Sequence, residues 1–420
     1  LNRRILDHLL HDAFPDEEAP ESEVDLILDP VPAAAAITAC LTPRGFSDVP
    51  KAYRMMMALG EERARFLSSR RCRHFLAAIA ARLLDRIAQT PDPDATLSTL
   101  VSVSDSLGGK GMLWEMFSES PAALDLTVRF CSSAPFLADL LVRNPGMIDD
   151  LQDSLLGDQQ LSRDQLEQDL WRLCRSAVDS LPSLIAFKVS HQLRIGVRDL
   201  LDQPSPHVTT AALADVAEVV LRVVVARAEL QMAERFGPPQ ATDGTPAGSV
   251  VLAMGKFGGR EMNYASDVDV VFLYDHEGQT AEHDQRGRTS HAHFFGEAAN
   301  RSLKLFNEFT PQGRLYEVDS RLRPGGRNGP LTVSLEAFAR YCAPDGPAAV
   351  WERQALVKAR VVVGKPDAAA RAAAIITAAS YGHAWTAQDV AEIQKMRLRM
   401  EDGAAATNLK RGPGGVVDIE

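Results

Sequence analysis

Two aspartates separated by a single residue are the most informative feature of the sequence. Asp267 and Asp269 stand at the start of an apolar run over residues 268–274, which is typical of a buried strand. Because side chains alternate along a strand, both carboxylates are expected on one face. Two like charges held so close repel each other unless a cation lies between them, and Mg²⁺ in proteins takes carboxylates together with substrate phosphates. The spacing predicts a magnesium–phosphate site, with a solvated pair of strand-end carboxylates as the alternative that it leaves open.

A glycine pair and a third aspartate support the magnesium interpretation. Gly258 and Gly259 precede the aspartates, and glycine lets backbone N–H groups approach a phosphate closely. Asp319 falls on the outward face of a later alternating segment, residues 314–322, and could supply a third carboxylate. Three carboxylates around two metal ions can polarise an attacking hydroxyl and hold a leaving pyrophosphate.

Basic residues are concentrated just after Asp319. Arg321 and Arg323 follow it directly, and Lys358 lies in a second basic stretch that ends at Arg360. Arginine matches phosphate oxygens with two parallel hydrogen bonds, and lysine acts as a point charge. Such a concentration in an acidic protein predicts a local phosphate-binding surface, and ordinary ion pairing remains the alternative for each residue alone.

These residues need a sheet to position them. Segments 249–254, 268–274, 314–322 and 357–364 are predicted strands, and 289–309, 335–342 and 350–356 are predicted helices. Residues before Gly237 show one helical pattern after another and almost no strand signal. The sequence predicts an α+β domain with extensive all-helical regions around it. Its expected divisions are a helical region over 1–90, a helical bundle or linker over 91–237, the α+β domain over 238–365 and further helices over 366–420.

Composition narrows the classes of protein and of partner. The chain has 420 residues, 45% of them hydrophobic and 24% charged, which is ordinary for a globular protein. Its net charge of −11 argues against nucleic acid or an anionic membrane as the general partner. The five cysteines are scattered and form no CxxC pair, which predicts a reducing, cytoplasmic setting. The sequence starts at Leu1 and stops within an apparently structured segment, so we expect a fragment of a longer protein.

Four segments carry a resemblance to a known family. They are GKFGGREMNYASDVDVVFLYD (255–275), GRLYEVDSRLRPGGRNGPLTVSLEAF (313–338), WERQALVKARVVVG (351–364) and GPGGVVDIE (412–420). In this order they resemble the motifs of bacterial glutamine synthetase adenylyltransferase, the bifunctional adenylyltransferase/adenylyl-removing enzyme. The helical segments 42–61, 90–109 and 120–151 resemble the region that joins the two halves of such enzymes. The chain is therefore expected to hold that region and most of the C-terminal, adenylylating half.

The resemblance implies a DNA polymerase β-like nucleotidyltransferase fold with a small mixed sheet. It makes Asp267, Asp269 and Asp319 the catalytic ligands of two Mg²⁺ ions. Gly258, Gly259 and Ser266 would line the phosphates of the substrate ATP, with Arg321, Arg323 and Lys358 as further phosphate contacts.

The implied reaction moves AMP from ATP to a tyrosine hydroxyl of glutamine synthetase and releases pyrophosphate. Regulation by glutamine and the PII signal protein would come with it. Two alternatives stay open: phosphorolytic removal of AMP, since GPL (329–331) and WER (351–353) look at least as much like the removing half, and a non-catalytic docking or regulatory role.

Overall fold

The computed structural model describes residues 21–29, 31–64, 67–148, 161–175, 179–241, 243–282, 287–405 and 407–419. Contacts within the chain divide it into two compact units. One unit contains the residues up to 161, Ile185–Ser205 and Pro311–Gly313, and the other contains Ser162–Leu184, Pro206–Thr310 and Arg314–Glu420. The four divisions predicted from the sequence stay predictions, but the long helix that precedes the sheet belongs to the same unit as the sheet.

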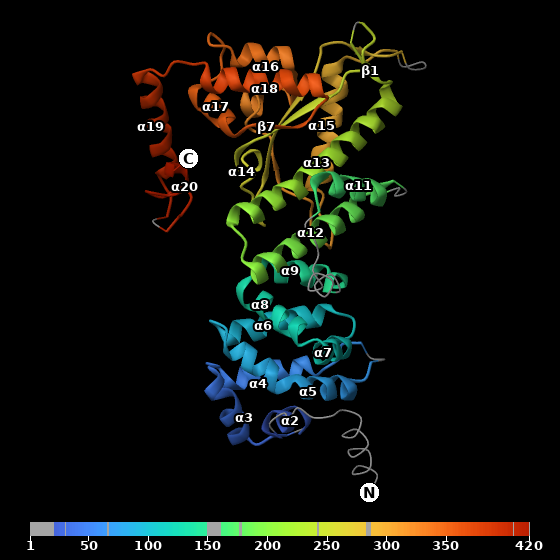
Figure 1. The fold of residues 1–420 in the computed structure, drawn as a ribbon, viewed down its shortest axis with the longest axis vertical. Coiled ribbons are helices and arrows are strands. Elements are labelled where there is room, and N and C mark those ends of the chain that lie inside the picture. Colours follow the sequence, from blue (N-terminus) through green and yellow to red (C-terminus); the bar gives the residue numbers. More distant parts are fainter. Residues whose placement is uncertain are drawn as a thin grey trace. The chain divides into compact units, whose positions relative to one another are not determined.

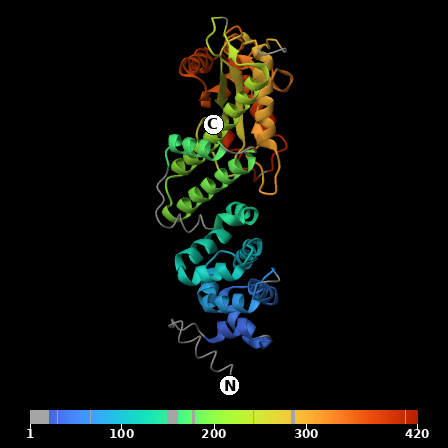
Figure 2. The same ribbon diagram turned by 90° about the vertical axis from the view of Figure 1, so that its right-hand side faces the viewer.

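The first unit is helical throughout the residues that the structure describes (Figures 1 and 2). Its helices are α2 (Glu21–Leu28), α3 (Ala34–Leu41), α4 (Val49–Leu59), α5 (Ser69–Ala88), α6 (Pro93–Ser106), α7 (Lys110–Glu119), α8 (Pro121–Ser133), α9 (Pro135–Arg143) and most of α12 (Leu181–Asp202). Short 3₁₀ turns lie at Thr42–Arg44 and Pro145–Met147. Helix α5 packs against α2 and α7, and α6 packs against α4, α8 and α9, so each of these helices buries its apolar stripe against its neighbours.

Side-chain caps set where several of these helices begin. Asp48, Ser68, Asp92 and Ser120 each accept a hydrogen bond from a backbone N–H of the first turn that follows. Proline stands in the first turn of α4, α6 and α8, where its missing N–H costs nothing. The helical prediction for this part of the chain is therefore confirmed, and side-chain caps fix where four of its helices begin.

The second unit is built on a small mixed sheet. Its strands are β2 (Ser249–Ala253), β3 (Val268–Tyr274), β5 (Val318–Asp319), β6 (Thr332–Ser334) and β7 (Arg360–Val363), in the order β5-β3-β2-β7 with β6 also paired to β3. Strand β2 runs antiparallel to β3 and β7, whereas β5 and β6 run parallel to β3. A separate antiparallel pair joins β1 (Pro239–Gln240) and β4 (Gln279–Thr280). The α+β class and the mixed sheet expected from the sequence are confirmed.

Helices cover both faces of this sheet. The helices of the unit are α11 (Arg163–Cys174), α13 (Pro206–Phe236), α14 (Gly255–Gly258), α15 (His291–Asn307), α16 (Leu335–Cys342), α17 (Val350–Ala355), α18 (Pro366–Tyr381), α19 (Ala387–Glu401) and α20 (Val416–Ile419). Short 3₁₀ turns lie at Gly326–Asn328 and Leu356–Lys358.

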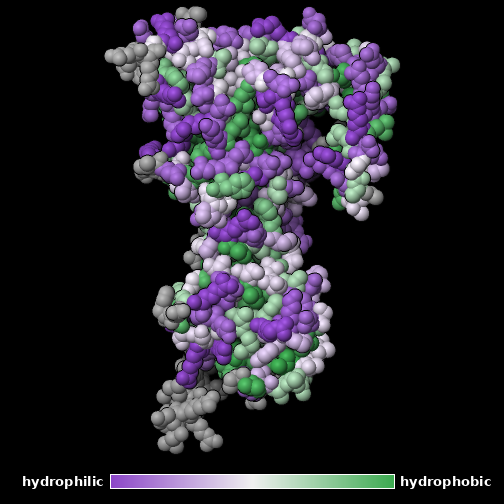
Figure 3. Space-filling model, turned by 180° about the vertical axis from the view of Figure 1, so that it is seen from behind, coloured by the Kyte–Doolittle hydropathy of each residue, from purple (hydrophilic) through white to green (hydrophobic). Residues whose placement is uncertain are grey.

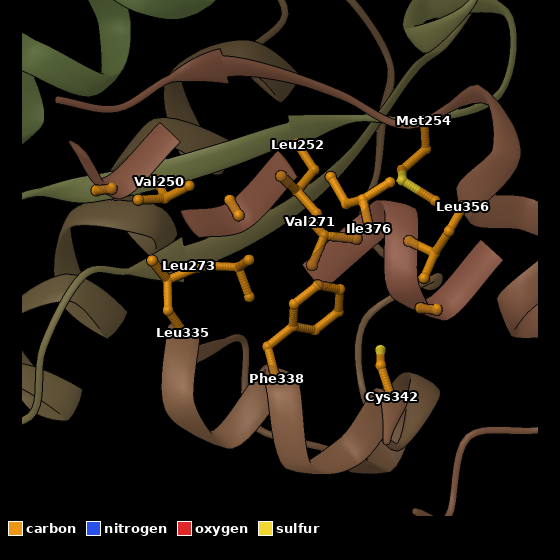
Figure 4. Close-up of a cluster of buried hydrophobic side chains, with 13 residues drawn as sticks. Val250, Leu252, Met254, Val271, Leu273, Leu335, Phe338, Cys342, Leu356 and Ile376 are labelled. Atoms are coloured by element: carbon orange, nitrogen blue, oxygen red, sulfur yellow. The ribbon is translucent and has the colours of Figure 1, made fainter. Parts of the chain in front are cut away.

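The alternation of side chains along β2 and β3 produces two cores. Leu252 and Val271 point to one face, where they pack with Phe338 of α16 and Ile376 of α18 (Figure 4). Tyr274 points to the other face and packs in a second cluster with residues of α13 and α15, including Phe295. A strand with both faces covered reads as a nearly continuous apolar run, and residues 268–274, interrupted only by Asp269, fit this pattern.

Two predicted strands are shorter than expected. Only residues 318–319 of the predicted strand 314–322 pair with β3, and the preceding Leu315 and Tyr316 are both buried outside the strand. In the segment 357–364, the residues up to Lys358 form a 3₁₀ turn. Strands β1, β4 and β6 have only two or three residues each and lie outside the strands predicted from the sequence.

The surface is mixed in polarity, and the cysteines are buried. Hydrophilic residues are mixed with smaller apolar areas over the face seen in Figure 3. Among the described helices, none has both the length and the apolar character needed to cross a membrane. All five cysteines are buried free thiols.

Candidate active site

Three aspartates come together where β3 and β5 begin. The parallel pairing of these strands places Asp269 directly opposite Asp319. The backbone N–H of Val268 donates to the carbonyl oxygen of Glu317 over 2.8 Å and helps to fix this register. Asp267 stands two residues before Asp269 and shares its face of the strand. Carboxylates from two segments about 50 residues apart in sequence thus become neighbours on strands roughly 4.8 Å apart.

A glycine turn lies against the central carboxylate. Gly255 begins α14 with φ of 52°, and a Cβ atom at this position would lie 2.7 Å from Oδ2 of Asp269. The preceding residue, Met254, donates its N–H to the backbone oxygen of Asp269 over 2.9 Å. Only glycine fits here, because both the left-handed backbone and the close approach exclude a side chain.

The predicted glycine pair lies in the same turn. The N–H groups of Gly258 and Gly259 donate to Met254 and Gly255 within α14, over 2.8 and 3.0 Å. A Cβ atom on Gly258 would lie 2.1 Å from the backbone oxygen of Lys358 and 2.6 Å from that of Ala253. Gly258 therefore lets the turn pack on β2 and on the chain entering β7. Phosphate contact by either glycine stays a prediction, and their own N–H groups are already bonded inside the turn.

Ser266 shapes the approach to Asp267. Its hydroxyl accepts a hydrogen bond from the N–H of Asn263 and donates to the side-chain oxygen of Asn263, both over 2.9 Å. These bonds close a tight turn immediately before the first aspartate. A contact of Ser266 with ATP stays a prediction.

Arg321 holds the third aspartate. Both its backbone N–H and its Nε donate to Oδ1 of Asp319, over 2.8 and 2.9 Å, and Nε also lies 2.7 Å from Oδ2. These bonds keep the pKa of the Asp319 carboxyl below its usual range. In this arrangement the guanidinium occupies the carboxylate that was predicted to bind metal.

The other two predicted basic residues are bonded within the unit. Arg323 donates to the backbone oxygens of Ser320, Arg327 and Gly329 over 2.8, 3.2 and 3.3 Å, and so ties together the loop after β5. Lys358 donates to Glu261 over 2.7 Å. The phosphate contacts predicted for both residues remain predictions.

Comparison with known proteins decides the family. Residues 124–375 match the family model described as glutamate-ammonia ligase adenylyltransferase. The chain belongs to this family. The match covers well over half of the chain and includes every predicted site residue.

Three relatives carry the name bifunctional glutamine synthetase adenylyltransferase/adenylyl-removing enzyme. The protein of Thioalkalivibrio sulfidiphilus (strain HL-EbGR7) is 33% identical over 396 residues, which cover 91% of this chain and 40% of that protein. The protein of Methylococcus capsulatus (strain ATCC 33009 / NCIMB 11132 / Bath) is 34% identical over 82% of this chain and 38% of its own length. That of Pseudomonas syringae pv. tomato (strain ATCC BAA-871 / DC3000) is 32% identical over 90% and 41%. The chain thus spans about two fifths of the length of these relatives.

The electrostatics of this adenylyltransferase family member centre on Asp269. Burial raises the pKa of its carboxyl, and the charges of Asp319 and Asp267 raise it further, to about 6. The positive charges of Lys410 and Arg321 act in the opposite direction. A carboxylate with two like charges beside it is a site that a cation would stabilise.

The donor set suits a hard divalent cation. Mg²⁺ takes oxygen ligands and keeps positions for water and phosphate, and three aspartates at one sheet edge supply such oxygens. Although these aspartates share one sheet edge, no group of three acidic, histidine or cysteine side chains among the described residues is arranged in this structure to hold a metal ion. Asp267 and Asp269 are the residues that would hold a cation here, and Asp319 would join them once Arg321 releases it.

The structure adds Gly255 to the residues predicted for this family member, and it adds Lys410 only as a positive charge that acts on Asp269. The signal for Gly255 is its place two residues after the buried strand β2, where a sharp turn is needed. Lys410 is more than 140 positions from Asp269 in the sequence, and only its effect on the pKa of Asp269 connects the two. Sequence spacing offers no signal for such a residue.

Proposed function

We propose that this chain transfers AMP from ATP to a tyrosine hydroxyl of glutamine synthetase and releases pyrophosphate. The observation that carries the proposal is the register of β3 and β5, which sets Asp269 beside Asp319, with Gly255 leaving room at Asp269. The family match and the names of the relatives support the chemistry and the protein substrate. We further propose a DNA polymerase β-like nucleotidyltransferase fold for the unit that carries the sheet.

In the proposed reaction the tyrosine oxygen attacks the α-phosphorus of ATP. The new oxygen–phosphorus bond forms as the bond to the β-phosphate breaks, and pyrophosphate leaves with the electron pair. Asp319, once free of Arg321, is placed to take up the hydroxyl proton. Two Mg²⁺ ions, when bound, would supply charge neutralisation for the nucleophile and the leaving group.

The residues of the chain would do the positioning. Asp267 and Asp269 would hold the cations, and Gly255 leaves room for the carboxyl of Asp269. The guanidinium of Arg321, released from Asp319, would turn to a phosphate oxygen. Control by glutamine and the PII protein, in the cytoplasm, belongs to this proposal as a property of the longer enzyme.

Removal of AMP by phosphorolysis is the second candidate. The segments GPL (329–331) and WER (351–353) favour it, and the relatives' names contain both activities. In this reaction an oxygen of inorganic phosphate attacks the phosphorus of the adenylyl-tyrosine, so that ADP and free tyrosine form. The same carboxylates would serve both directions.

The test follows label from α-labelled ATP onto purified glutamine synthetase in the presence of Mg²⁺ and the 420-residue chain. Label on a tyrosine that is lost in Asp267→Asn supports transfer at this site. Asp345→Asn, an exposed aspartate outside the site, is the matched control and should retain activity. ADP release from adenylylated glutamine synthetase and phosphate, without labelling in the first assay, would favour removal. Equal labelling by wild type and Asp267→Asn would overturn the site.

A further inference from the structure

One stripe of helix α13 faces the glycine turn and β7 with charged side chains. Asp215, Glu218 and Arg222 lie three and four positions apart, so they project from one side of the helix. We call these three residues the α13 polar stripe. Most other residues of this part of α13 are buried and apolar, so the stripe interrupts a helix face that could have packed with hydrocarbon alone.

The first residue of the stripe grips the end of the turn. Oδ1 and Oδ2 of Asp215 accept hydrogen bonds from the two terminal nitrogens of Arg260, over 2.7 and 2.8 Å. Arg260 has a left-handed backbone with φ of 58°, which is uncommon for a residue with a side chain. The two-pronged ion pair therefore holds a strained residue directly after Gly259.

Glu218, the second residue of the stripe, is linked to the glycine turn by Arg360 of β7. The side chain of Glu218 is 0% exposed and forms ion pairs with Arg163, Arg222 and Arg360. Arg360 connects Glu218 with α14, because its guanidinium also donates hydrogen bonds to the backbone oxygens of Gly258 and Phe257, over 3.3 and 3.5 Å. A buried carboxylate thus holds the arginine that bonds the carbonyls of α14.

The turn has little freedom between these anchors and the aspartates. Gly258 has no room for a Cβ atom against the backbone of Lys358, and Gly255 has none against Asp269. A shift of the turn away from α13 must therefore change the space around the carboxyl of Asp269. Closely packed parts pass on small displacements because they cannot deform continuously.

Stability alone does not account for these buried charges. Removing a carboxylate from water carries a large desolvation penalty, and well-packed apolar side chains are often as stabilising as a buried ion pair. The pairs of the stripe do supply directional bonds to Arg260 and to the carbonyls of Gly258 and Phe257, which apolar packing would not.

We propose that Asp215 and Glu218 are positioning residues that set the place of the Gly255–Arg260 turn relative to Asp269, and so govern binding of the nucleotide phosphates. The proposal rests on the proposed function for the nature of the ligand. The coupling of α13 to the Gly255–Arg260 turn does not depend on that function.

The test compares wild type, Asp215→Asn and Asp215→Glu in two measurements. Calorimetry with Mg²⁺ and a non-hydrolysable ATP analogue gives the dissociation constant, and amide hydrogen exchange reports on Gly258 and Gly259. We expect Asp215→Asn to weaken binding five- to tenfold and to accelerate exchange at both glycines, with Asp215→Glu restoring most of each. Asp169→Asn, which breaks the exposed Asp169–Arg172 pair on α11, is the matched control and should change neither.

The two readouts separate the two proposals. Unchanged binding and unchanged exchange in Asp215→Asn, with wild type binding the analogue, would overturn the positioning role. No binding by wild type would overturn the proposed nucleotide site, and the exchange rates would then decide the coupling alone. Glu218→Gln tests the second anchor. If it folds, it should accelerate exchange at Gly258 as Asp215→Asn does, and unchanged exchange would remove Glu218 from the proposal.

Discussion

At the scale of single residues, the site shows a conflict between stability and function. Asp269 is partly buried between two other carboxylates, which raises its pKa to about 6. A folded chain that keeps the proton to a higher pH than the unfolded chain loses stability as that proton leaves. The arrangement is unfavourable in the absence of a cation, which accords with the cation site that we propose here.

The first prediction is that Asp269→Asn stabilises the metal-free protein at neutral pH. Because the pKa of Asp269 is raised in the folded state, wild type loses stability as the pH rises from about 4 to about 6. It does not regain that stability at higher pH. After discounting for solvent screening, we expect a gain of about 1 kcal/mol in the free energy of unfolding at pH 7.5. At pH 3.5 most of the gain should vanish, because the carboxyl is then protonated in the folded state and mostly protonated in the unfolded state. Urea unfolding at the two pH values measures it, with Asp345→Asn as control, and an equal gain at both would contradict the electrostatic cause.

The second prediction concerns Arg321, which competes with a cation for Asp319. Arg321→Gln removes a charged partner whose side chain is 60% exposed, so the fold itself should lose little stability. We expect Mn²⁺, used as a spectroscopic substitute for Mg²⁺, to bind roughly fivefold more tightly to this variant. Titration followed by electron paramagnetic resonance measures the affinity, with Arg340→Gln on α16 as the control. Weaker Mn²⁺ binding in Arg321→Gln would mean that Arg321 does not compete for this carboxylate.

At the scale of elements, the sequence predicts the parts of the site that lie within one strand, but little of how the strands pair. Val268–Tyr274 is predictable as a strand because six of its seven residues are apolar, and the shared face of Asp267 and Asp269 follows from alternation. Asp269 and Asp319 lie side by side because β3 and β5 pair in one particular register. These strands are some 50 residues apart in the sequence, and no local pattern encodes their pairing. The sequence shows a concentration of basic residues, among them Arg321, Arg323 and Lys358, but it does not show which groups they bond. Those partners depend on the turns in which the three residues lie.

The third prediction separates the two glycines that the sequence treats as one pair. In Gly258→Ala the new methyl carbon would lie 2.1 Å from a backbone oxygen of the chain entering β7, so the turn must move. We expect a loss of about 1–3 kcal/mol in the free energy of unfolding, together with weaker binding of an ATP analogue.

In Gly259→Ala the nearest atom is an oxygen of the flexible Glu261 side chain, 3.0 Å away. This variant should lose less than about 0.5 kcal/mol, which urea unfolding of the two proteins can resolve. Equal losses would show that the packing of Gly258 on β7 does not hold the turn.

At the scale of the whole chain, one unit contains all the predicted site residues and the other contains none of them. The sheet, α13 and the segment around Lys410 fall in the second unit, whereas α2–α9 fall in the first. Amphipathic periodicity predicted helices in both units equally well, because it reports on local burial. It could not assign α13 to the unit of the sheet, since that depends on contacts such as those of Arg260 and Arg360 with α13.

The fourth prediction is that ligand binding protects only the unit that carries the site. A ligand that binds the native state at 100 times its dissociation constant stabilises that state by about 2.7 kcal/mol. With Mg²⁺ and a non-hydrolysable ATP analogue, amide exchange should slow in β2, β3, α14 and β5 and stay unchanged in α4–α9. The same experiment on Asp267→Asn is the control and should show no slowing. Protection that extends equally through α4–α9 would instead mean that the two units unfold as a single cooperative body, and that ligand energy is shared by the whole chain.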